Sequence, residues 1–406
     1  MTVTVATTVE EFLSLRQDWE EIRSENREEN FYYSFDWYDA LCRFCIEPDC
    51  SLFVLTIRDE ERVVAILPCW IIKKRPRFIN HRSLEFIGNI YSAYRGGIVL
   101  KGKEAEAADA AVKYMLSSRK LWDIAYLEYI PSKDPLLLAM ERSFEKNSVI
   151  MRKVEQYANI IVDFDPGQSA DDYWKSRKNS LRKHIKRYLH RLNCDGKVRI
   201  LLTCNPDQSV STAMDHYDAV YRGSWKEAEG DPLFHCNLAE HLLAKGKLRL
   251  FTLYFKEGEA EESSDGFLPV SQGDAARYIG EGYVPIATAY FAINGAYACM
   301  LKTAYRQEYA RYSPGTLLNW HVMQWLLDQD KAKIIDFQRD GDAYKYDWGR
   351  FRDMHMLLKA ASPASLPAIL ETLGEKYLIP ALRRKGWLKT PDFSVVSKPD
   401  SCEADG

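Results

Sequence analysis

The stretch VPIATAYFAINGAYACMLKTAYRQEYARYSPGTLL, residues 284–318, decides the fold. Two runs rich in β-branched and aromatic residues flank Asn294-Gly295, and Asn-Gly between such runs is the strongest short signal for a β-hairpin. Ser313 and Pro314 then open an apolar segment, and serine is a preferred N-cap while proline suits the first helical position. The stretch therefore predicts two antiparallel strands followed by a helix over 314–328.

The start of this predicted helix has the features of an anion site. Gly315 would let a ligand approach the backbone closely. Free N–H groups and the positive end of the helix dipole suit a pyrophosphate. A well-capped core helix needs the same Ser-Pro start, so the spacing alone leaves both interpretations open.

A second informative stretch is IIDFQRDGDAYKYDW, residues 334–348. An apolar strand delivers several ionisable groups to one loop, and α/β proteins often place their chemistry at such strand ends. Asp342 is a candidate base or amine-orienting carboxylate, and Tyr344 or Lys345 is a candidate proton donor. The alternative is a polar turn with ordinary surface charges.

A third stretch, WKSRKNSLRKHIKRYLHR at 174–191, holds eight Lys or Arg and no acidic residue, although the whole chain has a net charge of −3. Its apolar residues recur at helical spacing, which predicts one basic amphipathic helix over about 170–193. The charged face would suit phosphates of a nucleotide cofactor, tRNA or an anionic lipid surface. The alternative is a solvated face that pairs with the acidic remainder of the chain.

The rest of the chain alternates strand-like and helix-like segments. Residues 1–165 include two β-rich runs around a polar turn at 58–62 and helices near 105–117 and 136–146. The turn formers of DFDPG at 163–167 predict a domain boundary. We expect a second domain over 166–389, with an acidic loop inserted at 256–282, and a flexible tail at 390–406.

Several classes of protein are disfavoured. No stretch approaches the roughly 18 apolar residues of a membrane span, and the N-terminus does not resemble a signal peptide. The nine cysteines are scattered and the eight histidines form no HExxH motif, so we expect free thiols in a cytoplasmic protein and no metal site.

Taken together, these segments resemble the CelD/BcsL-like acetyltransferases, a branch of the GNAT (acyl-CoA N-acyltransferase) superfamily related to the Fem-type aminoacyl transferases. The resemblance rests on an aromatic segment at 31–44 with Trp37, on SRKNSLRK at 176–183 and on VYRGSW at 220–225. Its most specific part is SPGTLL at 313–318 followed by DFQRDGDAYKYDW at 336–348.

The resemblance implies an α/β (α+β) fold of two GNAT-like halves, each a mixed, mostly antiparallel sheet flanked by helices. It implies acetyl-CoA or another acyl-CoA as co-substrate, bound by the second half. The residues implied in cofactor binding are Cys299, Leu301, Thr303, Ser313, Pro314, Gly315, Thr316 and Leu317, and those implied at the acceptor end are Trp37, Tyr221, Trp225, Asp342, Tyr344, Lys345 and Trp348. The common GNAT phosphate loop has a different glycine spacing, which leaves an aminoacyl-tRNA donor open.

We therefore expect transfer of an acyl group, with acetyl as the first candidate, to an amine of a sugar, a peptide or an envelope polysaccharide precursor. No GxSxG motif supports an acyl-enzyme, so direct attack on the thioester is expected. Asp342 is the first candidate base, and Tyr312 or Tyr344 would protonate the leaving thiolate. The alternatives are a Fem-like aminoacyl-tRNA-dependent transferase and a non-catalytic accessory protein of polysaccharide, for example cellulose, biosynthesis.

Overall fold

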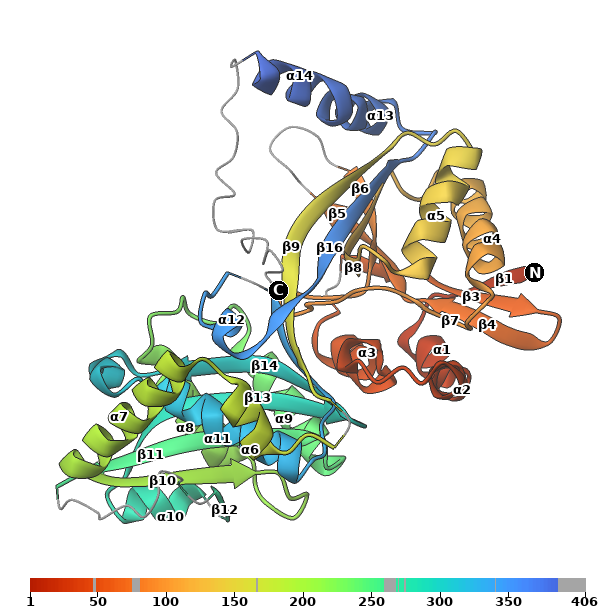
Figure 1. Cartoon of the computed structure of the whole chain (residues 1–406). Helices are drawn as coiled ribbons and strands as arrows, with labels where there is room; N and C mark the ends of the chain where they lie inside the picture. The colour runs from red at the N-terminus through yellow and green to blue at the C-terminus, as the bar shows by residue number, and fades with distance from the viewer. Residues whose placement is uncertain are drawn as a thin grey trace.

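A computed structural model describes residues 1–46, 49–74, 81–165, 167–258, 268, 270–273, 275–339 and 341–385. The described strands form two sheets, and helices cover them in two halves (Figure 1). The larger sheet has 12 strands in the order β12-β10-β11-β13-β14-β15-β9-β16-β8-β6-β5-β2, and the smaller has four in the order β1-β3-β4-β7. Most neighbours are antiparallel, which confirms the predicted α/β (α+β) class with mixed, mostly antiparallel sheets flanked by helices.

The hairpin and helix expected from 284–318 are present. β13 (Val284–Asn294) and β14 (Tyr297–Tyr305) pair antiparallel, with Asn294 opposite Tyr297. Gly295 has φ +59°, a left-handed conformation that the tight turn requires and that glycine adopts without strain. After the 3-10 helix η2 (Gln307–Tyr312), α11 spans Pro314–Asp328, as predicted.

In the second half, helices lie on both faces of the sheet (Figure 1). One buried cluster joins α6, α7 and α11 to the strands, and another joins α8 and α9. The remaining elements of this half are α6 (Ala170–Ser176), α7 (Asn179–Asp195), β10 (Gly196–Thr203), α8 (Ser211–Arg222), α9 (Pro232–Ala244), β11 (Leu248–Glu257), β15 (Ile334–Arg339) and α12 (Lys345–Trp348).

The prediction of one continuous basic helix was wrong, because the chain is extended at Arg177 and Lys178 and two helices result. Trp174 at the end of α6 stacks on Trp320 of α11, with ring centroids 4.0 Å apart. Arg177 donates a hydrogen bond to the carbonyl of Trp348. These contacts hold α6 in place and let α7 pack separately on the sheet.

The first half confirms the predicted hairpin around 58–62. β3 (Val54–Asp59) and β4 (Arg62–Leu67) pair antiparallel, but Pro68 separates β4 from β5 (Cys69–Lys74), which belongs to the larger sheet. The other elements are β1 (Thr2–Ala6), α1 (Val9–Ser14), α2 (Arg16–Asn26), η1 (Phe31–Tyr33), α3 (Phe35–Phe44), β2 (Cys50–Leu52), β6 (His81–Phe86), β7 (Ile98–Val99), α4 (Glu104–Ser117), β8 (Ile124–Pro131) and α5 (Pro135–Lys146).

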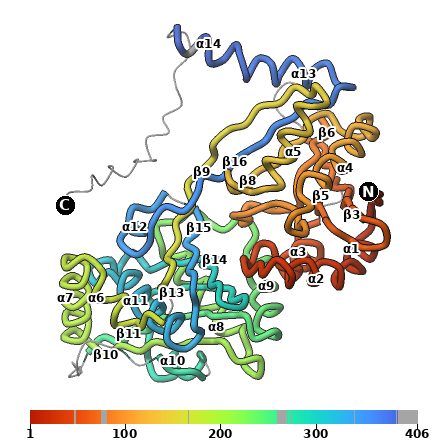
Figure 2. The backbone as a smooth tube through the Cα atoms, turned by 45° about the vertical axis from the view of Figure 1, so that its right-hand side comes forward, coloured from red at the N-terminus to blue at the C-terminus, as the bar shows by residue number. Residues whose placement is uncertain are grey.

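Two long strands join the halves, β9 (Met151–Asp163) and β16 (Arg350–Ala361), and Figure 2 shows them running together between the two halves. β9 pairs with β15 of the second half and with β16, which in turn pairs with β8 of the first half. β16 was missed by the sequence analysis. It places α13 (Leu366–Leu373), η3 (Gly374–Leu378) and α14 (Ile379–Arg384) beside the first half (Figure 1).

The proposed domain limits remain predictions. The described part of the acidic stretch 256–282 contains a short strand, β12 (Val270–Gln272), which pairs parallel with β10, and a helix, α10 (Ala275–Gly280). Residues 259–267, 269 and 274 of this stretch, and the tail at 390–406, lie outside the described residues.

Candidate active site

The central feature of the second half is a pair of parallel strands that separate. β14 and β15 pair only from Tyr297 to Cys299, opposite Ile334 to Asp336. Beyond that point β14 continues beside β13 to Tyr305, while β15 stays beside β9, with which it pairs from Ile334 to Asp336 and again at Arg339. The register of β13 and β14 also shifts near Leu301, which forms a bulge on β14 and leaves part of its backbone outside the ladder.

The N-terminus of α11 lies at this opening. Ser313 is the N-cap residue as expected, but it adopts φ +46° and its side chain makes no capping hydrogen bond. The hydroxyl of Ser313 instead contacts the Tyr188 phenol, and this hydrogen bond lowers the pKa of Tyr188. A Cβ on Gly315 would lie 3.1 Å from the Tyr305 ring, so only glycine leaves this wall unobstructed.

A pocket of about 210 Å³ lies between the end of β14 and the first turns of α11. Six residues proposed from the sequence line it: Trp225, Thr303, Gly315, Thr316, Asp342 and Tyr344. The remaining lining residues, which the sequence analysis missed, are Lys226, Ala304, Tyr305 and Asn319. Segments around 225, 303, 316 and 342 therefore meet at one place.

Two buried polar atoms of this pocket have no hydrogen-bond partner among the described residues, the hydroxyl of Tyr344 and Oδ1 of Asn319. Burial raises the pKa of Tyr344 well above its usual value, so the phenol stays protonated and can donate. Buried polar atoms are normally paired. These two are therefore available to a bound molecule.

Charged groups surround these atoms. The Asp342 carboxylate is 44% exposed and lies 3.5 Å from Nζ of Lys345. Lys226 donates a hydrogen bond from Nζ to the carbonyl of Thr303 at 2.6 Å, and burial lowers its pKa to about 8. Because Lys226 directly follows Trp225, the VYRGSW segment could have indicated that Lys226 also lines the pocket. The loop after α8 thus closes over β14.

A buried carboxylate, that of Glu229, lies beside this loop. Glu229 accepts a hydrogen bond from the Tyr217 hydroxyl at 2.7 Å and lies 3.4 Å from Nζ of Lys302. Lys302 in turn lies over the rings of Tyr91, from the first half, and Tyr221. Tyr221, proposed from the sequence, therefore packs on β14 rather than lining the pocket.

The other proposed residues lie around the pocket at differing depths. Leu301 is half-buried at the bulge and Lys345 reaches the carbonyl of Arg339 beneath the loop. The Tyr312 hydroxyl donates to Asp195, on the far side of η2. The fully or nearly fully buried members are Trp37, Cys299, Tyr312, Pro314, Leu317 and Trp348. The chemical roles proposed for all these residues remain predictions.

The basic helix α7 lies next to the same pocket. Its apolar residues are buried, whereas Lys183, Lys186 and Arg187 are exposed. Arg191 donates a hydrogen bond to the carbonyl of Arg311 at 3.0 Å, just before α11 begins. Together with the Tyr188 contact to Ser313, this places the cationic face beside the N-terminus of α11.

The described residues contain no cluster of three or more His, Cys, Asp or Glu that could hold a metal ion. None of their helices combines the length and the apolar character that crossing a bilayer requires.

Comparison with known proteins gives a matching family model. The model for the acetyltransferase (GNAT) domain matches residues 268–346, the part that holds β13, β14, α11 and β15. This part of the chain is a GNAT-type acyltransferase domain. No curated protein gives a significant match to the chain.

Solved structures also resemble the chain. The crystal structure of FemX superposes with a TM-score of 0.55 at 10% identity and covers 88% of this chain and 97% of that chain. A tandem GNAT protein from the clavulanic acid biosynthesis pathway gives a TM-score of 0.48 at 12% identity, covering 90% and 100%. The likeness to FemX shows the fold alone.

Proposed function

We propose that the protein is an acyl-CoA-dependent N-acyltransferase whose donor binds in the pocket between β14 and α11. The observation that carries the proposal is the pair of unpartnered buried groups, Tyr344 and Asn319, in a pocket at the N-terminus of α11. A helix N-terminus favours phosphate groups, and separated strands expose backbone for hydrogen bonding. Exposed cations of α7 lie beside the same end of the helix.

The residues have complementary roles in this proposal. Backbone groups around Gly315 and Thr316 bind the pyrophosphate, and the edge of β14 from Thr303 to the bulge at Leu301 binds the acyl-bearing arm. Backbone N–H groups near the bulge stabilise the oxyanion that forms when the amine attacks the thioester carbon. Cys299 lies at the closed end of the opening, where it limits the depth of the arm.

Proton transfer completes the reaction without a covalent enzyme intermediate. Asp342 removes a proton from the attacking amine, and the Tyr344 phenol donates its proton to the thiolate as the carbon–sulfur bond breaks. Lys345 keeps the Asp342 carboxylate oriented. The acceptor we propose is an amine on a sugar, a peptide or an envelope polysaccharide precursor, and the location we propose is the cytoplasm.

Calorimetry with acetyl-CoA tests the donor site. We expect saturable binding by the wild type and its loss in Gly315→Leu, because the added side chain would meet Tyr305 and fill the pocket. Gly374→Leu is the matched control, since a Cβ at Gly374 meets no atom within 4 Å. A wild type that binds no acyl-CoA would overturn the proposal, and binding by Gly315→Leu equal to the control would overturn the placement.

A second candidate is transfer from an aminoacyl-tRNA, favoured by the exposed cationic face of α7 beside the pocket. Phosphate-driven RNA binding weakens steeply with salt. A mobility shift with bulk tRNA at low and high salt separates the two donors. A salt-sensitive shift that is lost in Lys183→Gln/Lys186→Gln supports tRNA, and the absence of any shift removes this candidate.

A further inference from the structure

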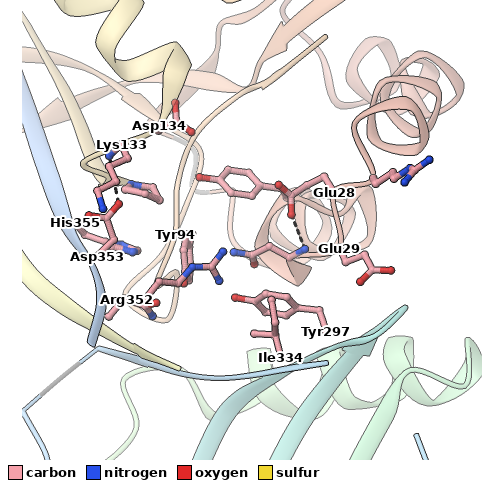
Figure 3. Close-up of a pocket in the computed structure, with 15 residues that line it drawn as sticks. Glu28, Glu29, Tyr94, Lys133, Asp134, Tyr297, Ile334, Arg352, Asp353 and His355 are labelled. Atoms are coloured by element: carbon pink, nitrogen blue, oxygen red, sulfur yellow. Dashed lines mark hydrogen bonds between the residues drawn. The ribbon is translucent and has the colours of Figure 1, made fainter. Parts of the chain in front are cut away.

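A second cavity, of about 570 Å³, lies where the first half, the crossing strands and the starts of β14 and β15 meet (Figure 3). Its size is typical of pockets that hold small-molecule ligands. Its walls come from the segment after α2, the loop between β8 and α5, and β16. The lining residues used below are Glu28, Tyr33, Asp134, Asn159 and Arg352.

Arg352 extends from β16 into this cavity (Figure 3) and has no hydrogen bond or ion pair with any other described residue. Arg350, two residues earlier on the same strand, pairs with Asp163. Burial lowers the pKa of Arg352, but nearby phenols and carboxylates, led by Tyr297, outweigh it and raise the pKa overall. The guanidinium therefore stays charged, and its planar pair of N–H edges matches a carboxylate.

Two buried polar atoms of the lining also have no partner among the described residues. They are the hydroxyl of Tyr33, which is 9% exposed, and Oδ1 of Asn159, which is fully buried. The amide nitrogen of Asn159 is already used, since it donates to Asp336 at 2.9 Å. Its free oxygen can only accept, so the missing partner is an N–H or O–H donor.

Acidic groups form another part of the wall. Figure 3 shows Glu28 and Asp134 on the side of the cavity away from β14 and β15. Burial raises the pKa of both carboxyls, and that of Asp134 to about 6. No lysine or arginine forms an ion pair with either of them among the described residues. An ammonium group in the cavity would compensate their burial.

We propose that this cavity is a binding site for a small zwitterion of the amino-acid class, distinct from the acyl-transfer pocket. Arg352 binds the carboxylate, and Glu28 together with Oδ1 of Asn159 receives the ammonium group. A buried layer separates the two sites, in which Asp336 accepts hydrogen bonds from the hydroxyls of Tyr94 and Tyr297. The proposal does not depend on the identity of the acyl donor.

The test is calorimetric titration of the full chain with L-alanine, L-glutamine and L-phenylalanine, each compared with its carboxamide and its N-acetyl form. We expect saturable binding of at least one amino acid, and at least tenfold weaker binding of its carboxamide and N-acetyl forms. A failure of all three amino acids to bind, or equal affinity for the matching carboxamide, would overturn the proposal.

Variants locate the site. Arg352→Gln should weaken binding at least tenfold and Glu28→Gln several-fold, whereas Arg350→Gln, on the same strand but outside the cavity, should bind as the wild type does. Gly315→Leu should also bind the amino acid normally, which separates this site from the donor pocket. Equal losses in Arg352→Gln and Arg350→Gln, with circular dichroism showing both folded, would refute the placement.

Discussion

Asp336 is a fully buried carboxylate whose removal should destabilise the fold strongly. Its Oδ2 accepts hydrogen bonds from the hydroxyls of Tyr94, at 2.6 Å, and Tyr297. Its Oδ1 accepts from the Asn159 amide at 2.9 Å and from the Gln338 backbone N–H at 2.6 Å. The donors come from the first half, the second half and the crossing strand β9, so one side chain ties together three parts of the molecule.

The size of the effect follows from these four hydrogen bonds. Asp336→Ala leaves all four donors without their acceptor, and each unpaired buried group costs about 1–3 kcal/mol. Since water entering the vacated space would satisfy some donors, we expect the free energy of unfolding to fall by about 4 kcal/mol. Asp336→Asn keeps the Oδ1 interactions and disturbs the two hydroxyls only, so we expect about 2 kcal/mol.

Urea denaturation followed by tryptophan fluorescence and by far-ultraviolet circular dichroism measures the effect. Asp163→Asn is the matched control, because Asp163 is 38% exposed and pairs with the exposed Arg350, an interaction worth about 0–1 kcal/mol. The expected order of destabilisation is Asp336→Ala, then Asp336→Asn, then the control. If Asp336→Ala falls within about 1 kcal/mol of Asp163→Asn, the hydrogen bonds around Asp336 do not stabilise the fold as argued.

Four further predictions concern the donor pocket. Folding lowers the pKa of Lys226 from 10.5 to about 8. The free energy of unfolding of the wild type, relative to Lys226→Met, should therefore rise between pH 8 and 10.5, by on the order of 1–2 kcal/mol after screening. A difference that does not depend on pH would contradict this prediction. Tyr344→Phe should lower kcat by about 100-fold, whereas Tyr312→Phe, whose hydroxyl is bound outside the pocket, should change kcat less than about twofold; equal losses would refute the assignment. Lys186→Gln/Arg187→Gln should raise KM for acetyl-CoA at low salt, and the difference from the wild type should shrink as salt screens the charges. Calorimetry should give one acetyl-CoA per chain, and a stoichiometry of two would contradict our assignment of the donor site to the second half alone.

Local signals in the sequence were sufficient where neighbouring residues determine the structure. The Asn294-Gly295 turn and the Ser313-Pro314 helix start depend on backbone preferences within a few residues, and both elements were predicted correctly. β16 was missed because charged and apolar residues mix in RFRDMHMLLKAA, and its burial comes from β8 and β9, which lie about 200 residues earlier. The break between α6 and α7 likewise depends on a distant partner, Trp320.

For the candidate site too, local motifs could be recognised in the sequence, whereas features set by long-range packing could not. Motifs near 225, 303, 315 and 342 were visible separately, and the fold places them around one pocket. Asn319 was not visible as a site residue, because it lies within a helix whose pattern indicates a buried core and only its unpartnered oxygen distinguishes it. The direction of a side chain could not be predicted from the sequence either. Tyr312 and Tyr344 were equally good candidates for the proton donor, but only Tyr344 lines the pocket.

The two halves repeat one strand arrangement, and their side chains explain why we assign the donor to the second half only. In the first half β6 and β8 form a parallel pair like that of β14 and β15. There, however, buried Arg95 lies 3.8 Å from Glu85 on β6 and 3.4 Å from Glu128 on β8, which fills the position with an internal ion-pair cluster.

The helix that follows β6 and β7 is equally unsuited to phosphates. The first turn of α4 carries Glu104 and Glu106, whose negative charges oppose anion binding at the N-terminus of that helix. In contrast, α11 has no acidic residue in its first turn, and the cationic face of α7 lies beside it. Charge and packing, rather than the backbone arrangement, therefore distinguish the half to which we assign the acyl-CoA site from the other half.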